Sequence, residues 1–240
     1  MKRYFVVPFF FACGVLLYGE VFPDWFIVLR DAVYEQNLGA DEIAPLYRAT
    51  EKTARETLSG KALYLMLSRC EYMMGRAYQY EERKDEAAAR YEAGMAWAEK
   101  SLEEGASSEG WRMLAENISQ SCAVKSVSYA MANGLKVEKY AKNALDLDPR
   151  NSAALYMIAA RYVFAPSPFH NYRRGIRMME DIIDQNETIM EKDDRFNVYS
   201  AIGYAYMQQK NYREAKPWLE KSLIIYPTNK FVRIMFDSAG

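Results

Sequence analysis

The feature of this sequence that most constrains its fold is a regular spacing of aromatic, small and proline residues between positions 199 and 227. Tyr199, Gly203 and Tyr206 fall three or four residues apart, which is the spacing of one helix face. Ala215 follows Gly203 after twelve residues, and Pro227 follows Ala215 after twelve more. Glycine and alanine let two helices approach closely, whereas proline ends a helix because it lacks a backbone donor. The spacing therefore predicts a tightly packed pair of antiparallel helices.

Apolar residues recur at spacings of three and four from residue 24 onward, and no segment shows the alternation of a half-buried strand. Half of the 240 residues are hydrophobic, which is enough for one domain with a continuous core. We expect an all-α chain in which Asn133-Gly134 ends the fifth helix. The expected helices cover residues 24–36, 41–58, 61–80, 85–104, 111–131, 136–147, 152–165, 172–185, 195–209, 212–226 and 230–237.

Residues 196–229 resemble the tetratricopeptide repeat, a helix–turn–helix unit of 34 residues. In this resemblance Tyr199 takes the large aromatic place, Gly203 the small place on the first helix and Ala215 the small place on the second. Pro227 ends the second helix and sets the turn into the next unit. The resemblance implies antiparallel helix pairs that stack as a right-handed superhelix, an α-solenoid.

Weaker copies of the same pattern lie upstream, at residues 68–104, 118–151 and 152–186. Their phase is consistent with the unit at 196–229, so we expect a single repeat domain over residues 20–240. The residues in repeat-forming places are Gly75, Tyr78, Ala87, Pro149, Tyr162, Gly203, Tyr206, Ala215 and Pro227.

The first 19 residues differ in character from the rest of the chain. Lys2 and Arg3 precede an apolar run that ends at Gly19, a pattern typical of a secretory signal peptide. The run is broken by Pro8 and is shorter than the roughly 20 residues of a membrane span. We expect cleavage near Gly19 and an exported, periplasmic protein. Two other interpretations stay open: a lipoprotein signal with Cys13 acylated, or an uncleaved membrane anchor.

The charge balance excludes one class of partner. The chain has 31 basic and 32 acidic residues, so it has no basic surplus that could release counterions from nucleic-acid phosphates. We expect no nucleic-acid binding, and no membrane contact beyond an N-terminal anchor. Cys70 and Cys122 lie in apolar helical stretches, where a free cysteine behaves as a small hydrophobic residue. Whether these two cysteines pair stays open.

The sequence lacks the residue constellations that enzymes use. Its one histidine, His170, lies in a proline-bearing turn, and catalysis or metal binding by histidine needs partner groups. No zinc-protease, phosphate-loop or nucleophile-elbow motif occurs. We therefore expect no enzymatic activity, no cofactor and no metal. The acidic segment 191–194 is expected to be a solvated turn at a helix start, since acids favour helix N-termini.

Tetratricopeptide arrays bind partners in a concave groove that is lined by the first helix of each pair. On the expected register this lining is aromatic, small and mostly uncharged, which suits an apolar peptide or helix, or a hydrophobic small molecule. A carboxylate clamp is not expected. The alternative, that individual residues belong to the core between repeats, stays open. The candidate groove residues are Tyr72, Arg76, Gln79, Tyr129, Tyr156, Asn197, Ser200, Tyr204 and Met207, with Cys122, Ser126, Ala160 and Val163 beside them.

We therefore expect a non-catalytic scaffold or adaptor of a bacterial cell envelope that binds a peptide or a partner protein in the groove. The enlarged turn between Tyr162 and Gly175 and the long helix pair at 61–104 are also similar to exported tetratricopeptide partners of periplasmic TRAP transporters. That similarity implies an alternative function, a ligand-binding accessory of a solute transporter. An accessory for organic acids needs Arg or Lys deep in its pocket, and the sequence offers few candidates. The oligomeric state stays open.

Overall fold

The computed structural model describes residues 22–240, so the expectations for residues 1–19 lie outside the described part of the chain. Within residues 22–240 the chain forms eleven α-helices and no strand, which confirms the predicted all-α class. The helices are α1 (Asp24–Glu35), α2 (Ala40–Thr57), α3 (Gly60–Tyr80), α4 (Lys84–Glu103), α5 (Ser108–Val124), α6 (Val127–Leu147), α7 (Ser152–Phe164), α8 (Tyr172–Asn186), α9 (Lys192–Gln208), α10 (Tyr212–Ile225) and α11 (Lys230–Ser238).

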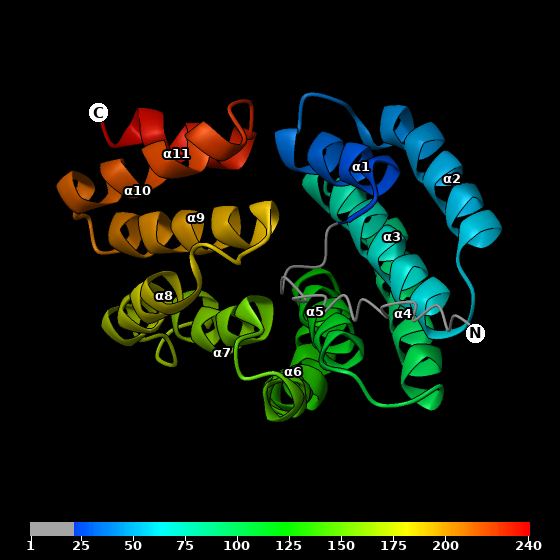
Figure 1. The fold of residues 1–240 in the computed structure, drawn as a ribbon. Helices are drawn as coiled ribbons and strands as arrows, with labels where there is room; N and C mark the ends of the chain where they lie inside the picture. The colour runs from blue at the N-terminus through cyan, green and yellow to red at the C-terminus, as the bar shows by residue number, and fades with distance from the viewer. Residues whose placement is uncertain (1–21) are drawn as a thin grey trace, which may run out of the picture.

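These helices form antiparallel pairs that stack one on the next (Figure 1). The first helices of successive pairs, α1, α3, α5, α7 and α9, contact one another in turn, and α11 covers α9 after the last pair. Apolar side chains fill the spaces between pairs; Leu29, Met74, Met113 and Ile202 are among those that are almost fully buried. We call the side of the array that the first helices share the inner face, because it carries the candidate site.

Two glycines show how closely paired helices approach. A Cβ on Gly75 would lie 2.5 Å from Cε1 of Tyr91, and a Cβ on Gly203 would lie 2.5 Å from Cδ2 of Leu219. Both contacts join the first helix of a pair to the second helix at the same sequence offset, so the α3–α4 and α9–α10 pairs share one packing geometry. Of the other repeat-forming residues, Ala87 and Ala215 are fully buried, Tyr78, Tyr162 and Tyr206 are half-buried, and Pro149 and Pro227 are exposed at turns.

The boundary between α5 and α6 differs from the predicted one. We expected the fifth helix to end at Asn133-Gly134, but α6 runs through both residues. The break falls earlier because the Ser126 hydroxyl accepts a hydrogen bond from the Tyr129 amide at 3.3 Å and caps α6. Gly134 has open space around it, so the exposed side of a helix accommodates it. The second helix of this pair therefore begins at Val127, nine residues before the expected start at residue 136.

Helix α1 joins the two ends of the array. Asn197 on α9 donates to the Tyr34 hydroxyl at 3.0 Å, and the Asn229 side chain donates to the Tyr34 carbonyl oxygen at 2.7 Å. Tyr226 donates to Asp31 at 2.9 Å, and its ring stacks on Tyr34 with a centroid distance of 5.1 Å. Through these contacts α1 closes the array against α9 and the turn before α11, as Figure 1 shows.

The structure also describes the two cysteines and the histidine that the sequence analysis considered. Cys70 is buried, Cys122 is half-buried, and both are free thiols. His170 stacks on Tyr172 with ring centroids 4.5 Å apart.

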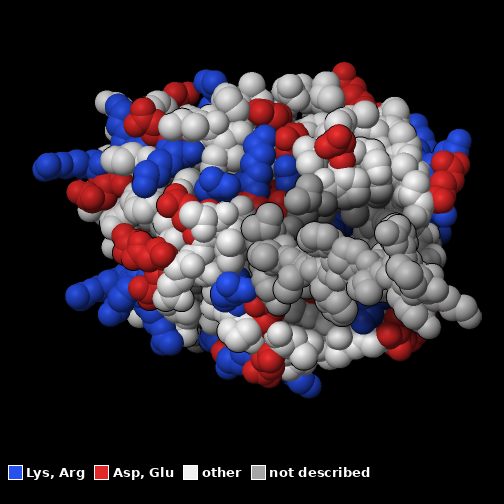
Figure 2. Space-filling view, in the orientation of Figure 1, with Lys and Arg blue, Asp and Glu red and all other residues white. Residues whose placement is uncertain are grey.

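Positive and negative side chains are interspersed over the face in Figure 2, which shows no large area of one sign. Among residues 22–240, no helix combines the length and the hydropathy that crossing a membrane requires.

Candidate functional site

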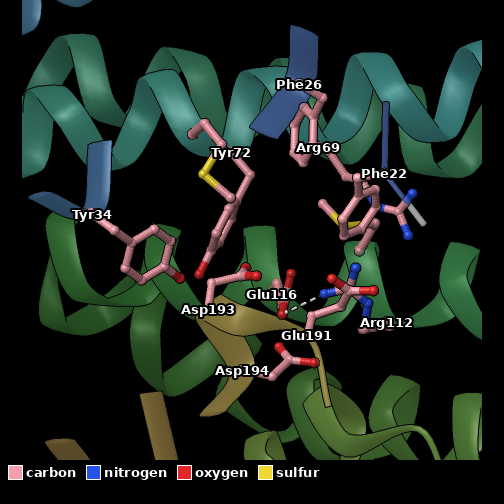
Figure 3. Close-up of a pocket in the computed structure, with 12 residues that line it drawn as sticks. Phe22, Phe26, Tyr34, Arg69, Tyr72, Arg112, Glu116, Glu191, Asp193 and Asp194 are labelled. Atoms are coloured by element: carbon pink, nitrogen blue, oxygen red, sulfur yellow. Dashed lines mark hydrogen bonds and ion pairs between the residues drawn. The ribbon is translucent and has the colours of Figure 1, made fainter. Parts of the chain in front are cut away.

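A pocket lies on the inner face, where α1, α3, α5 and the start of α9 meet (Figure 3). About 360 Å³ of space lies between its walls, part of it open to solvent, and a water-sized group can occupy about 20 Å³ of it. The walls combine aromatic rings, methionines and charged groups. They are formed by Phe22, Phe26, Tyr34, Arg69, Tyr72, Met73, Arg112, Met113, Glu116, Glu191, Asp193 and Asp194.

Glu109 organises the ion pairs on one wall of the pocket. Arg112 donates to one of its oxygens at 2.8 and 2.9 Å, and Arg69 donates to the same oxygen. Asn151 donates to the other oxygen at 2.8 Å. Burial alone would raise the pKa of Glu109, but Arg112 and Arg69 lower it to about 2. Glu109 is therefore ionised and fixes both arginines, and Arg112 extends the network to Glu116 at 2.9 Å.

The acidic segment 191–194 is not the solvated turn that we expected. Asp194 is 9% exposed, and Ser152 on α7 donates to its carboxylate at 3.1 Å. The side chain of Asp193 is 13% exposed and lies 3.4 Å from Arg30 of α1, which also lies 3.6 Å from Glu191. The difference arises because α1 packs over this segment from the other end of the sequence, a contact that local pattern cannot reveal.

Three carboxyl groups of the pocket titrate above their ordinary range. Burial, reinforced by Asp193, holds the pKa of Asp194 well above its usual value, and the same two causes raise the pKa of Glu191. Burial also raises the pKa of Glu116, against the attraction of Arg112. A raised carboxyl pKa means that the negative charge is incompletely compensated. The pocket therefore favours the arrival of positive charge, from a proton or from a ligand.

Arg76 lies among tyrosine rings beside this pocket. Its guanidinium group donates to the Tyr72 hydroxyl at 3.0 Å and to the Tyr80 hydroxyl, and it lies 5.3 Å from the Tyr34 ring centroid. Asn197 donates to the same Tyr34 side chain at 3.0 Å. The structure thus brings three of the candidate groove residues, Tyr72, Arg76 and Asn197, together around Tyr34.

A second feature of the inner face is a row of three rings from three successive inner helices. The ring of Tyr204 on α9 lies 5.1 Å from that of Phe164 on α7 and 6.2 Å from that of Phe231 on α11. Phe164 and Phe231 are 47% and 46% exposed, and Tyr204 is half-buried between them. We call these three residues the aromatic row. It presents apolar surface to solvent on the last part of the array.

The remaining candidate groove residues lie elsewhere or serve packing. Gln79 accepts a hydrogen bond from Tyr91 between α3 and α4, and Ser200 is buried and donates to the Asn197 carbonyl oxygen. Tyr129 lies on α6, the second helix of its pair, beneath Lys125. The other candidates are the half-buried Tyr156, Met207 and Cys122, the buried Ala160 and Val163, and Ser126, which caps α6.

Reasoning from the sequence missed the charged part of the pocket. Arg112 and Glu116 lie four residues apart in a stretch of α5 that is otherwise apolar or small, so they share one helix face. Arg69 and Glu71 interrupt a similar stretch of α3. Such an interruption is a signal for buried polar contacts, because charged residues are seldom buried without partners. No comparable sequence pattern indicates that Arg30 of α1 forms buried ion pairs beside the pocket.

The described residues contain no metal-binding arrangement. Among residues 22–240, no group of three or more His, Cys, Asp and Glu side chains is placed to hold a metal ion. The carboxylates of the pocket instead contact arginines and Ser152.

The Tetratricopeptide repeat family model matches residues 196–229, the unit that contains α9 and α10. Residues 196–229 are therefore similar to a tetratricopeptide repeat. One solved structure that it matches is YrrB, described as a TPR protein with an unusual peptide-binding site, at 14% identity over 90% of this chain and 98% of that one, with a TM-score of 0.39. Another is the APC/C hetero-tetramer Cut9–Hcn1, at 15% identity over 90% of this chain and 45% of that one, with a TM-score of 0.39. No curated protein matches the chain.

Proposed function

We propose that this protein is a non-catalytic scaffold of a bacterial cell envelope that binds a peptide or an extended segment of a partner protein along its inner face. The tetratricopeptide repeat at 196–229 supports the coarse role, because this fold generally serves protein interaction. Location in the envelope rests on the signal-like pattern of the first 19 residues. The proposal names no catalytic residue and no cofactor.

The observation that carries the proposal is the exposure of the aromatic row. Buried ring pairs stabilise a fold, but Phe164 and Phe231 leave about half of their surface in solvent. Large rigid rings that are already stacked provide contact area at low entropic cost to a partner. Tyr204 joins the two phenylalanines, so the row continues across α7, α9 and α11. An apolar side chain of a bound peptide would lie against this row.

The contacts elsewhere on the inner face favour the C-terminal end of the array as the place where a peptide binds. Arg76 donates to the Tyr72 hydroxyl and lies over the Tyr34 ring, and Asn197 donates to the Tyr34 hydroxyl. These contacts help to close the array around α1. The aromatic row lies further along α9, and its outer surface has no such internal contact to lose on binding.

The alternative of a transporter accessory for organic acids has less support. Arg69 and Arg112 do line the pocket, as that function requires. Both donate to Glu109, however, and Glu116, Glu191 and Asp194 add negative charge around them. An organic acid would meet carboxylates there. A TRAP-type accessory role therefore stays a second proposal, which the two arginines favour and the surrounding carboxylates oppose.

The proposal is tested by peptide display. A random peptide library is selected on the full chain, and the affinities of the enriched peptides are measured for the wild type and for Phe231→Ala. We expect enriched peptides with aromatic or aliphatic residues, whose affinity falls at least ten-fold in the variant. Phe169→Ala removes an equally large ring that is 74% exposed in the turn before α8, so it is the matched control and should bind normally. Equal affinity for all three proteins would reject the aromatic row as the binding surface.

A further inference from the structure

The pocket between α1, α3, α5 and α9 contains more acidic groups than basic ones. Each basic group there is within ion-pair distance of an acid: Arg30 with Asp31, Glu191 and Asp193, Arg69 and Arg112 with Glu109, and Lys192 with Asp31. The acids are more numerous, because Arg112 pairs with Glu116 as well as with Glu109, and Asp194 adds a further carboxyl group. Of the groups that line the pocket, Arg69 and Arg112 are basic, and Glu116, Glu191, Asp193 and Asp194 are acidic; Arg30, Arg76, Lys192, Asp31 and Glu109 lie around it.

The surplus is concentrated at Asp194. This residue is more than nine-tenths buried, it lines the pocket, and within residues 22–240 it forms no ion pair. Among residues 22–240 its one side-chain hydrogen bond comes from the Ser152 hydroxyl, which reaches Oδ2 at 3.1 Å. A buried carboxylate outside an ion pair costs free energy, and a positive charge that approaches it lowers that cost. In Figure 3 the carboxylates of Glu116, Asp193 and Asp194 gather in the middle of the pocket.

The remaining walls match an organic cation rather than a hydrated ion. Phe22, Phe26, Tyr34 and Tyr72 place aromatic rings on the α1 and α3 side of the pocket, across from Asp194. Ring faces attract ammonium and guanidinium groups, and they also accept the apolar stem that carries such a group. The same surface already receives cations from within the chain, because the Arg69 guanidinium carbon lies 4.4 Å from the Phe22 ring centroid.

We propose that this pocket binds one compact organic cation, an ammonium or guanidinium group on an apolar stem. The source is either a Lys or Arg side chain of a bound polypeptide or a free alkylamine. Asp194 accepts hydrogen bonds from the cationic head, Glu116 adds negative charge, and Tyr72 packs against the stem. The narrow space, about 20 Å³ for a water-sized group, fits one such head. This inference rests on the proposed binding function. It adds a binding site for a charged group to the apolar surface of the aromatic row.

The test uses the full chain and three probes in calorimetric titration at neutral pH and low salt. The probes are n-pentylamine, an acetylated and amidated Gly-Lys-Gly peptide, and the same peptide with its lysine ε-acetylated. We expect at least one charged probe to bind, and the ε-acetylated peptide to bind at least ten-fold more weakly. Tighter binding of the lysine peptide identifies a polypeptide as the source, and tighter binding of pentylamine identifies a small amine; both support the inference.

The decisive variant is Asp194→Asn, with Glu220→Gln as the matched control because Glu220 is an exposed acid on α10. Asp194→Asn should lower the affinity for the charged probe at least ten-fold. It should not lower the thermal midpoint, since it removes an uncompensated buried charge. Glu220→Gln should bind like the wild type. No binding of either charged probe, equal binding of the acetylated peptide, or normal binding by Asp194→Asn would overturn the inference. If the charged probes fail while Phe231→Ala still weakens peptide binding, the pocket inference fails alone and the proposed function stands.

Discussion

The side-chain amide of Asn197 donates a hydrogen bond to the Tyr34 hydroxyl at 3.0 Å, across 163 positions of sequence. Tyr34 also lies 5.3 Å from the Arg76 guanidinium carbon and 5.1 Å from the ring centroid of Tyr226. One tyrosine of α1 thus contacts α3, α9 and the turn that follows α10. The first helix therefore belongs to the same cooperative unit as the last repeat, although the two are far apart in the chain.

This closure predicts that Asn197→Ala destabilises the whole domain. Removal of the amide leaves the fully buried Tyr34 hydroxyl without its donor, a loss of about 1–3 kcal/mol. Urea unfolding followed by circular dichroism measures the free energy of unfolding. Asn133→Ala is the control, because the Asn133 amide donates within its own helix to the Tyr129 carbonyl oxygen. Equal, small effects of the two substitutions would contradict the closure.

A second prediction concerns the close approach of α9 and α10. A Cβ on Gly203 would lie 2.5 Å from Cδ2 of Leu219, and Leu219 is fully buried and has little room to move. We expect Gly203→Ala to destabilise the protein by about 1–3 kcal/mol through overpacking, despite the better helix propensity of alanine. Gly134→Ala is the matched control in open space on α6, and it should stabilise the protein by about 0.5–1 kcal/mol. Differential scanning calorimetry compares the two, and a stabilising Gly203→Ala would contradict the packing.

A third prediction concerns pH. Burial raises the pKa values of Asp194, Glu191 and Glu116, so the folded state binds protons at these groups before the unfolded chain does. The thermal midpoint should therefore rise as pH falls from 7 through the raised pKa values, and this gain is complete at the ordinary carboxyl pKa near 4. Below that range stability falls, because the pKa values of Asp31 and Glu109 are lowered by neighbouring cations and their ion pairs are lost on protonation.

The Asp194→Asn variant separates this effect from the rest of the molecule. The variant should have a higher midpoint than the wild type at pH 7 and a smaller rise between pH 7 and 5, while the loss at low pH persists. An unchanged pH profile would show that Asp194 does not titrate in this window. The other titratable groups that line the pocket are Tyr34, Arg69, Tyr72, Arg112, Glu116, Glu191 and Asp193, and those around it are Arg30, Asp31, Arg76, Glu109, Tyr156, Lys192 and Tyr226.

The sequence was sufficient to predict most of the helices, because local rules determine them. Periodicity placed α3, α7 and α10 within a residue or two of their observed bounds, and the spacing of Gly203 and Ala215 indicated a close helix pair. The α5–α6 boundary was wrong because Asn-Gly commonly ends a helix, and a single serine cap at Ser126 overrode that preference.

The candidate site was less predictable than the fold. Tyr72, Arg76, Asn197 and Tyr204 were placed on the inner face by helical register alone, and the structure does bring three of them together. The acidic segment 191–194 was predicted to be solvated, since no local pattern shows that Arg30 will cover it. Contacts between the two ends of a repeat array depend on its overall curvature, which accumulates from small rotations between units.

The measurement that most directly tests the central claim is site-specific photocrosslinking in the native cells. A photoreactive phenylalanine analogue replaces Tyr204 in the aromatic row, and in a second strain it replaces Tyr212, which is 45% exposed on α10 outside the row. Our account predicts a discrete crosslinked polypeptide from position 204, absent from position 212 and lost when Phe231→Ala is added. Crosslinks of equal yield from both positions, or none from position 204, would contradict binding along the inner face.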